Sequence, residues 1–213
     1  MRLGGRYLDT VDAPPQFDQH TVHESNMKDR EASSKPSTGD EEVVNMCLIN
    51  LLMALSLILK RESCVIPDRK AFHVKKLKID QPLYEARVDG ILTEPENQKS
   101  IKALIEAKRY VRSKNIRAVR MQEGAQTAAL ISSAQTLGKG TIWTISLGAH
   151  QASITKSAYT SEYVNFLNGY EPDETALLDR TEYGPFDLDG RSTMWQFLLY
   201  MAVIMEGEDY IRL

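Results

Sequence analysis

The sequence predicts an α/β fold in which a mixed central β-sheet is flanked by helices. Two strand-like segments, residues 84–92 and 101–108, are joined by a polar loop and form an expected hairpin. Two long helical segments, residues 40–61 and 116–136, lie on either side of that hairpin in the chain. Further strands and a final helix follow, and this mixture favours a sheet with helices packed on its faces.

The composition suits one soluble domain preceded by a tail. The chain has 213 residues, of which 42% are hydrophobic and 26% charged, values typical of a globular protein with one core. Residues 1–39 are polar and lack periodicity, so we expect a disordered tail and a domain over residues 40–213. Cys47 and Cys64 are too few for a disulfide framework and are expected to be buried thiols. No secretory signal is visible, which predicts an intracellular protein of the nucleus or cytoplasm.

The first predicted helix covers residues 40–61. Asp40 is its expected cap, and Glu41 and Glu42 lie in the first turn, where the helix dipole favours acidic side chains. The apolar stretch at residues 43–59 is interrupted by polar residues and is shorter than the ~20 residues of a membrane span. We therefore expect a buried core helix and no membrane contact.

Three strand-like segments follow this helix. Residues 71–79 are expected to turn Phe72 and Val74 inward. In residues 101–108 the side chains alternate between two faces of the sheet. One face is expected to carry Ile101, Ala103, Ile105 and Ala107, and the other Lys102, Leu104, Glu106 and Lys108. The hairpin with residues 84–92 then brings Asp89 beside Glu106.

The second half of the chain completes the predicted layers. The helix of residues 116–136 carries small residues that suit close packing against a sheet. Residues 141–147 and 151–159 are expected to form a second pair of strands.

No further strand is predicted after residue 160. A short helix over residues 161–168 and an acidic loop over residues 169–190 precede Ser192, the expected cap of a last helix running to Ile204. The side of that helix expected to face the core consists of Trp195, Leu198, Leu199, Ala202 and Met205.

The hairpin predicts a site for a divalent cation. Asp89 and Glu106 supply oxygen ligands, and Mg²⁺ is usually held by one or two carboxylates together with water and phosphate oxygens. Lys108, on the same strand face as Glu106, can hold an attacking water or a developing negative charge. These groups are what metal-assisted hydrolysis of a phosphodiester requires.

The pattern of Asp89 followed by Glu106-Ala107-Lys108 on the next strand resembles the PD-(D/E)XK nuclease superfamily. The run IEAKR followed by a helix that bears glutamine is similar to its fungal nuclease-like branch. The resemblance implies a restriction-endonuclease-like three-layer core, metal ligands at Asp89 and Glu106 for Mg²⁺ or Mn²⁺, and a catalytic lysine at Lys108. Val88, rather than the proline of the motif's name, precedes Asp89.

The same resemblance implies supporting residues. An acidic residue on the helix before the first strand often completes the metal site, which points to Glu42 or Glu41. Glu85 is an alternative, because it lies on the same strand face as the metal-binding aspartate. Gln122 and Gln126 on the following helix are implied to act in catalysis near the metal or the substrate strand.

The distribution of charge favours a nucleic-acid partner. A net charge of −3 opposes non-specific coating of nucleic acid by the whole surface, but basic residues gather around the predicted site, where they suit a phosphate backbone. The residues expected to bind nucleic acid are Arg109, Arg112, Lys114, Arg117 and Arg120.

Three interpretations remain open at the level of sequence. The first is a metal-dependent nuclease, with DNA as the expected substrate. The second is an inactive module that keeps the nuclease fold and binds nucleic acid or a protein. The third is that Asp89, Glu106 and Lys108 form an ordinary ion-pair network. The sequence does not fix the oligomeric state.

Overall fold

The computed structural model describes residues 41–60, 64–75, 82–94, 100–134, 138–207 and 211–212. These residues belong to one compact unit, Pro36–Leu213. The predicted tail and the predicted cap Asp40 lie outside the described residues.

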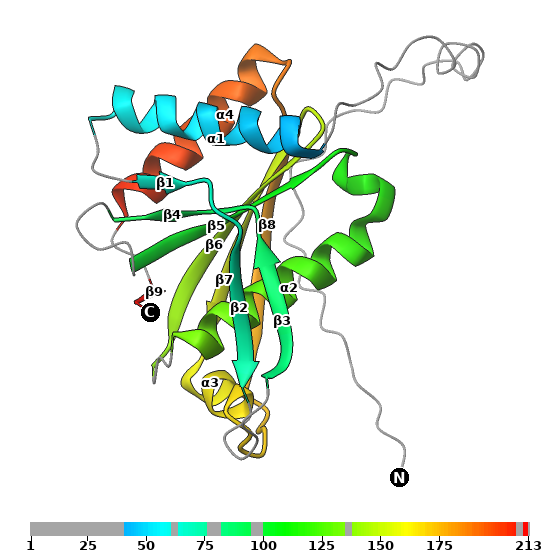
Figure 1. Ribbon diagram of the computed structural model, residues 1–213, viewed down its shortest axis with the longest axis vertical. Coiled ribbons are helices and arrows are strands. Elements are labelled where there is room, and N and C mark those ends of the chain that lie inside the picture. Colours follow the sequence, from blue (N-terminus) through cyan, green and yellow to red (C-terminus); the bar gives the residue numbers. More distant parts are fainter. Residues whose placement is uncertain are drawn as a thin grey trace, which may run out of the picture. The chain divides into compact units, whose positions relative to one another are not determined.

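A mixed β-sheet forms the centre of the described part of the chain (Figure 1). Its strands follow the order β1-β4-β5-β6-β7-β8, and β9 pairs with β5. Strands β5 and β6 are parallel, whereas the other neighbours are antiparallel. The strands are β1 (Cys64–Ile66), β4 (Gly90–Thr93), β5 (Ser100–Lys108), β6 (Gly140–Gly148), β7 (Gln151–Tyr159), β8 (Leu178–Asp187) and β9 (Ile211–Arg212).

Helices cover both faces of this sheet. Helices α1 (Glu41–Ile58) and α4 (Arg191–Glu206) pack on one face. On the other face lie α2 (Ile116–Ser133) and a separate antiparallel pair, β2 (Lys70–Lys75) and β3 (Pro82–Val88). The short elements are η1 (Arg112–Asn115) and α3 (Ser161–Leu167). The predicted class, an α/β fold with a mixed sheet between helices, is confirmed.

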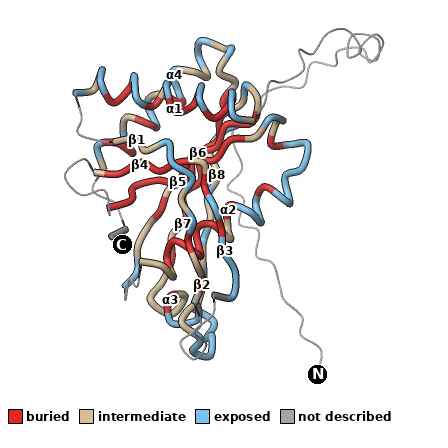
Figure 2. Tube along the Cα trace, viewed as in Figure 1, coloured by how far each residue is buried: buried red, intermediate tan, exposed pale blue. Residues whose placement is uncertain are grey.

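Two apolar cores fill the spaces between these layers. Leu48 of α1 and Phe197 of α4 meet Ile105 of β5 in the first core, and all three side chains are fully buried. Leu130 of α2 and Leu104 of β5 meet in the second. Strand β5 is thus buried on both faces, and Figure 2 shows the sheet centre coloured as buried. This position fixes the strand that carries the predicted chemistry.

The predicted strand of residues 84–92 is divided in two at Asp89. Strand β3 ends at Val88 and pairs with β2, whereas β4 starts at Gly90 and pairs with β1 and β5. Asp89 bridges the break by donating its backbone N–H to the carbonyl of Ile105, 3.0 Å away. Glycine suits position 90 because an added Cβ would lie in tight contact with the Ile66 carbonyl oxygen, 3.0 Å away.

The expected alternation in β5 fails at its start. Leu92 pairs with Ala103 but Thr93 pairs with Ile101, so Lys102 is an extra, bulged residue. The bulge moves Ile101 into the core on the α2 side. It turns Lys102 toward the end of α4, where its Nζ donates to the carbonyl oxygens of Met205 (3.1 Å) and Gly207 (3.0 Å).

The prediction of an acidic loop over residues 169–190 was wrong, because β8 occupies residues 178–187. Charged residues and Gly184-Pro185 interrupt the alternating pattern expected of a strand, yet β8 pairs with β7 along its length. It lies at the end of the sheet order, where charged side chains are common because they discourage edge-to-edge association.

Helix α4 also differs from its prediction. The cap position is Gly190, and Ser192 lies inside the helix. The residues that face the core are Phe197, Met201, Ile204 and Met205, with Leu198 partly buried. Trp195 and Leu199 are 58% and 62% exposed because they belong to the opposite stripe of the helix.

Helix α1 is a core helix on one side only. Among the described residues it is the helix long and apolar enough to cross a membrane, but Leu48 and Leu52 are fully buried in the first core. The expectation of two buried thiols was wrong: Cys47 on α1 is exposed, and Cys64 in β1 is partly buried.

Candidate active site

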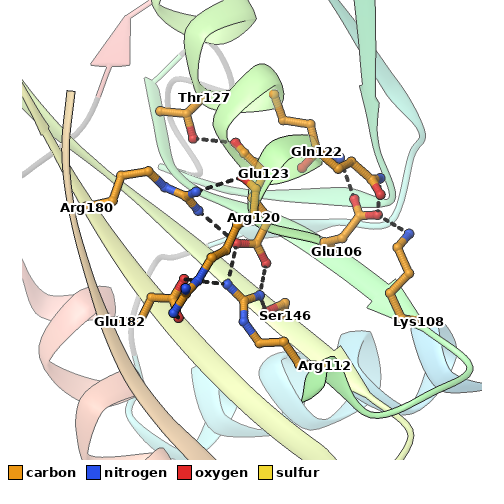
Figure 3. A network of polar contacts seen from close by, with 11 residues as sticks. Glu106, Lys108, Arg112, Arg120, Gln122, Glu123, Thr127, Ser146, Arg180 and Glu182 are labelled. Carbon is orange, nitrogen blue, oxygen red and sulfur yellow. Dashed lines mark hydrogen bonds and ion pairs between the residues drawn. The ribbon is translucent and has the colours of Figure 1, made fainter. Parts of the chain in front are cut away.

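The predicted carboxylate and lysine meet at the end of β5. Glu106 and Lys108 are two residues apart on this strand, so they share a face, and Lys108 Nζ donates to Glu106 Oε1 (Figure 3). Only 2% of Glu106 is exposed, whereas Lys108 is partly exposed. The strand therefore holds a buried carboxylate beside a partly exposed ammonium group.

Asp89 approaches the same place from the break between β3 and β4. Its Oδ2 accepts the backbone N–H of Ala107 at 2.9 Å, which places Asp89 beside the Glu106–Lys108 segment. The side chain of Asp89 is 14% exposed. The predicted hairpin thus brings Asp89, Glu106 and Lys108 together.

Two glutamines from α2 hold the carboxylate of Glu106. Gln122 Nε2 donates to Oε1 and Gln126 Nε2 donates to Oε2, both at 2.6 Å. Gln126 Nε2 also lies 2.7 Å from the carbonyl oxygen of Arg87 in β3. The spacing of four residues places both amides on one face of the helix. The structure therefore places Gln122 and Gln126 at the site, as the sequence predicted.

Of the acidic candidates for a third metal ligand, Glu41 lies nearest to the lysine. Its Oε1 is 3.6 Å from Lys108 Nζ. Glu42 Oε2 instead contacts Arg69 Nη2 at 3.2 Å. Glu85 pairs with neighbours in the separate β2–β3 sheet, Arg87 (2.6 Å) and His73 (3.1 Å). The role of completing a metal site remains a prediction, for which the geometry favours Glu41 over the other two.

Arg69 belongs to the site although the sequence did not single it out. Its Nε lies 3.7 Å from Asp89 Oδ1, and the same guanidinium contacts Glu42. The side chain is 63% exposed. Its approach depends on the pairing of β1 with β4, in which Ile66 lies opposite Ile91. No motif carries that information, because the two strands are separated by the whole β2–β3 pair.

The charges at the site perturb one another. Burial raises the pKa of Glu106; its hydrogen bond to Lys108 and the charge of that lysine oppose the change, and the charge of Asp89 adds to it. Burial alone would lower the pKa of Lys108, but the hydrogen bond and charge of Glu106, with the charges of Glu41 and Asp89, raise it overall. Two carboxylates that repel each other thus share a site with one cation.

This donor set fits a hydrated Mg²⁺ or Mn²⁺. No group of three or more His, Cys, Asp or Glu side chains is placed to hold a metal within the described ranges, but Mg²⁺ keeps several waters and needs only one or two carboxylates. Asp89 and Glu106 supply two. Gln126 Oε1 is buried and lacks a hydrogen-bond partner, so it can accept a hydrogen bond from a metal-bound water.

The predicted phosphate-binding residues divide into two groups. Arg109, Lys114 and Arg117 are exposed and remain available to a phosphate backbone. Arg112 is only 9% exposed and its guanidinium pairs with Glu123 and Glu182. Arg120 is exposed, but it forms two hydrogen bonds to Glu182, at 2.9 and 3.0 Å. We therefore leave Arg112 and Arg120 out of the phosphate-contacting surface proposed below.

A cluster of charges around the buried Glu123, which the sequence did not predict, fixes α2 beside the site. We call it the arginine clamp; its members are Arg112, Arg120, Glu123, Arg180 and Glu182 (Figure 3). Glu123 is fully buried and accepts hydrogen bonds from Arg112 of η1 and Arg180 of β8, with its Oε2 2.9 and 2.8 Å from their Nη2 atoms. Because Glu123 adjoins Gln122 on α2, the clamp ties the glutamine-bearing turn to β8 and η1.

No family model matches the chain, and comparisons with curated proteins and with solved structures found no match. The functional argument therefore depends on the site itself.

Proposed function

We propose that this protein is a metal-dependent nuclease that hydrolyses phosphodiester bonds of nucleic acid, with DNA as the first substrate to test. The observation that carries the proposal is the meeting of Asp89, Glu106 and Lys108 at one end of β5. The mixed sheet between helices agrees with a restriction-endonuclease-like core, which we propose as the finer description of the fold. An intracellular location, where nucleic acid is present, belongs to the same proposal.

Asp89 and Glu106 would hold the ion. When bound, Mg²⁺ or Mn²⁺ supplies a Lewis acid for the phosphoryl oxygens and lowers the pKa of a bound water. Gln122 and Gln126 keep the Glu106 carboxylate in one orientation, since each donates to a different oxygen of it. Lys108, held between Glu106 and Glu41, orients the attacking water or stabilises the negative charge that develops on phosphate.

Exposed basic residues beside the site would bind the phosphate backbone. Arg109 follows Lys108 directly, Lys114 lies in η1, and Arg117 lies in the first turn of α2. Contacts of this kind set the register of a nucleic acid without reading its sequence. Their effect on affinity should weaken as salt concentration rises, because it depends on release of counterions.

The test is cleavage of plasmid DNA, single-stranded DNA and RNA with Mg²⁺ or Mn²⁺, by the wild type and by Lys108→Ala. We expect the substitution to reduce the rate about 10²-fold or more, as the loss of a group that stabilises developing charge does. Lys139→Ala removes an exposed lysine outside the site and is the control. A wild type inert on every substrate with both metals, or a Lys108→Ala variant of full activity, would refute the proposal.

One observation favours the second candidate, an inactive module that binds nucleic acid or a protein. Both oxygens of Glu106 already accept hydrogen bonds from protein side chains, so a metal must displace or share at least one of these contacts. Mn²⁺ binding followed by electron paramagnetic resonance separates the two candidates. A nuclease binds the ion through Asp89 and Glu106, whereas an inactive module binds DNA without it.

A further inference from the structure

The outward faces of α1 and α4 are apolar. The residues that define this outer helical face are Met46, Met53, Leu57, Trp195, Leu199 and Val203, and between 46% and 79% of each is exposed. On each helix they recur at intervals of four or seven residues, so they form one stripe. Scattered exposed hydrophobic residues are ordinary, but a continuous patch marks a surface that binds something.

The two stripes lie on the same side of the molecule. Both helices bury their opposite sides, including Leu48 and Phe197, against the same face of the sheet. Their outer sides therefore both point away from that face, and Figure 1 shows α1 and α4 together there. The two stripes are parts of one surface.

This surface lacks charge. Residues 43–59 and 192–205, which contain both stripes, include no Asp, Glu, Lys or Arg. Depletion of charged residues distinguishes the buried centre of a protein interface from ordinary surface. The absence of Lys and Arg also makes the outer helical face unsuitable for a nucleic-acid backbone.

The size of the surface suits a protein interface. Helices of 18 and 16 residues are roughly 27 and 24 Å long, and each presents a face about 10 Å wide, which together cover on the order of 500 Å². A standard interface buries about 800 Å² on each partner, of which somewhat more than half is apolar. The outer helical face can therefore supply the apolar part of one such interface.

The charges around the surface do not suit a membrane. Helix α1 begins with Glu41 and Glu42, and α4 starts at Arg191 and ends at Glu206. A helix that lies on an anionic membrane carries a row of basic residues beside its apolar face, which is absent from these two described helices. Helix α1 also cannot leave the sheet to span a bilayer without exposing the core that it helps to form.

We propose that the outer helical face binds a second copy of this chain. In a two-fold symmetric contact the same patch meets itself, so a charged patch would bring like charges together, whereas an uncharged apolar patch is compatible with its own copy. The contact would leave the β5 site open, because Asp89 and Glu106 lie at the sheet and not on the outer sides of α1 and α4. The proposal does not depend on the nuclease function.

The test is the molar mass of the full chain in solution by sedimentation equilibrium. We expect the wild type to have twice the monomer mass of 24.1 kDa, and Leu57→Glu and Leu199→Glu to weaken self-association at least about 100-fold, because each places a charge in an apolar contact. Met121→Glu is the matched control: Met121 is 76% exposed but lies on α2, at the other face of the sheet.

Circular dichroism and urea unfolding of each variant would show that a monomer is still folded. A monomeric wild type overturns the proposal, and co-sedimentation of that monomer with vesicles of anionic phospholipid would assign the face to a membrane instead. A dimer that both Leu57→Glu and Leu199→Glu preserve also overturns it. Slower labelling of exposed Cys47 by a maleimide in the wild type than in Leu199→Glu would support the expected contact.

Discussion

Glu106 is the most constrained residue of the candidate site. It is almost fully buried, and Lys108, Gln122 and Gln126 all donate hydrogen bonds to its carboxylate. A buried carboxylate is stable in its charged form only when such partners surround it. The structure therefore keeps the Glu106 carboxylate in one orientation, and we expect its protonation state to affect stability.

The raised pKa of Glu106 gives a pH dependence of known sign. A carboxyl group whose pKa is higher in the folded than in the unfolded state favours folding when it is protonated. This stabilisation is complete below the unfolded-state pKa of 4.5 and is lost as the pH rises through the folded-state pKa. Glu106→Gln cannot titrate. We therefore expect the unfolding free energy of the wild type, measured relative to Glu106→Gln by urea titration, to fall as pH rises from about 4 and then to level off. A difference that grows with pH would contradict this assignment.

Arg69 is expected to compete with a metal for Asp89. Its guanidinium contacts both Asp89 and Glu42, so removing it takes a cation away from the Asp89 carboxylate. Arg69→Ala should bind Mn²⁺ more tightly, by about 2- to 5-fold for one partly exposed ion pair, while binding DNA more weakly because a positive charge beside the site is lost. Calorimetry measures the first effect and fluorescence anisotropy the second.

Arg87→Ala is the control for this experiment. Arg87 is also an exposed arginine paired with a glutamate, but its partner Glu85 lies in the β2–β3 pair. It should leave the Mn²⁺ affinity unchanged. Equal changes in both variants would mean that only the net charge of the protein matters.

At the residue scale, the sequence predicts the central residues of the site, Asp89, Glu106 and Lys108, but not the surrounding charged residues. Alternation along a strand places Glu106 and Lys108 together, and a hairpin brings Asp89 to them. Arg69 and Glu123 were not predicted because their ion-pair partners lie on elements that only the fold brings close to them. Arg112 was misassigned for the same reason: its partner Glu182 belongs to a strand that the sequence did not reveal.

At the scale of elements, α2 is positioned by the arginine clamp. The helix begins without a side-chain hydrogen bond at its cap, and its buried Glu123 connects it instead to η1 and β8. Since Gln122 and Gln126 must lie within hydrogen-bond distance of Glu106, any shift of this helix changes the support of that carboxylate. The clamp therefore links the edge strand β8 to the candidate active site.

Glu123→Gln should be strongly destabilising. It removes the Glu123 charge from the partly buried Arg180 and from the buried Arg112, which keeps its contact to Glu182, and breaking a buried pair in this way typically costs about 3–5 kcal/mol. Urea unfolding measures the loss. Glu85→Gln, which breaks an exposed pair, should cost far less. Similar losses in both variants would show that the clamp is no more important than a surface ion pair.

The elements themselves were predicted with uneven success, for physical reasons. Helices α1 and α2 and strands β5, β6 and β7 follow from apolar periodicity, because their inward faces are regular. The buried side of α4 was misjudged because both of its sides are apolar, so periodicity does not show which side meets the sheet. Strand β8 was missed because charged residues interrupt its apolar alternation; two of them, Arg180 and Glu182, belong to the arginine clamp.

At the scale of the whole molecule, a bound ion should raise the melting temperature. An ion that binds only the folded state stabilises it by about 2.7 kcal/mol at a concentration 100 times its Kd, which corresponds to a shift of roughly 5–11 °C in a domain of this size. Calorimetry with and without Mn²⁺ measures the shift. Asp89→Asn should remove most of it, because one of the two carboxylates becomes a neutral amide. A shift that survives in this variant would place the ion elsewhere.

The position of β5 determines which residues of the site have fixed positions and which lie on segments that can change in sequence. Glu106 and Lys108 stand on an interior strand, so their places cannot drift unless the sheet itself opens. Arg69 and Glu41 come from segments at its margin, a loop before β2 and the first turn of α1. Randomising these marginal segments is therefore a direct route to altered substrate preference, since the chemical groups at the centre would keep their geometry.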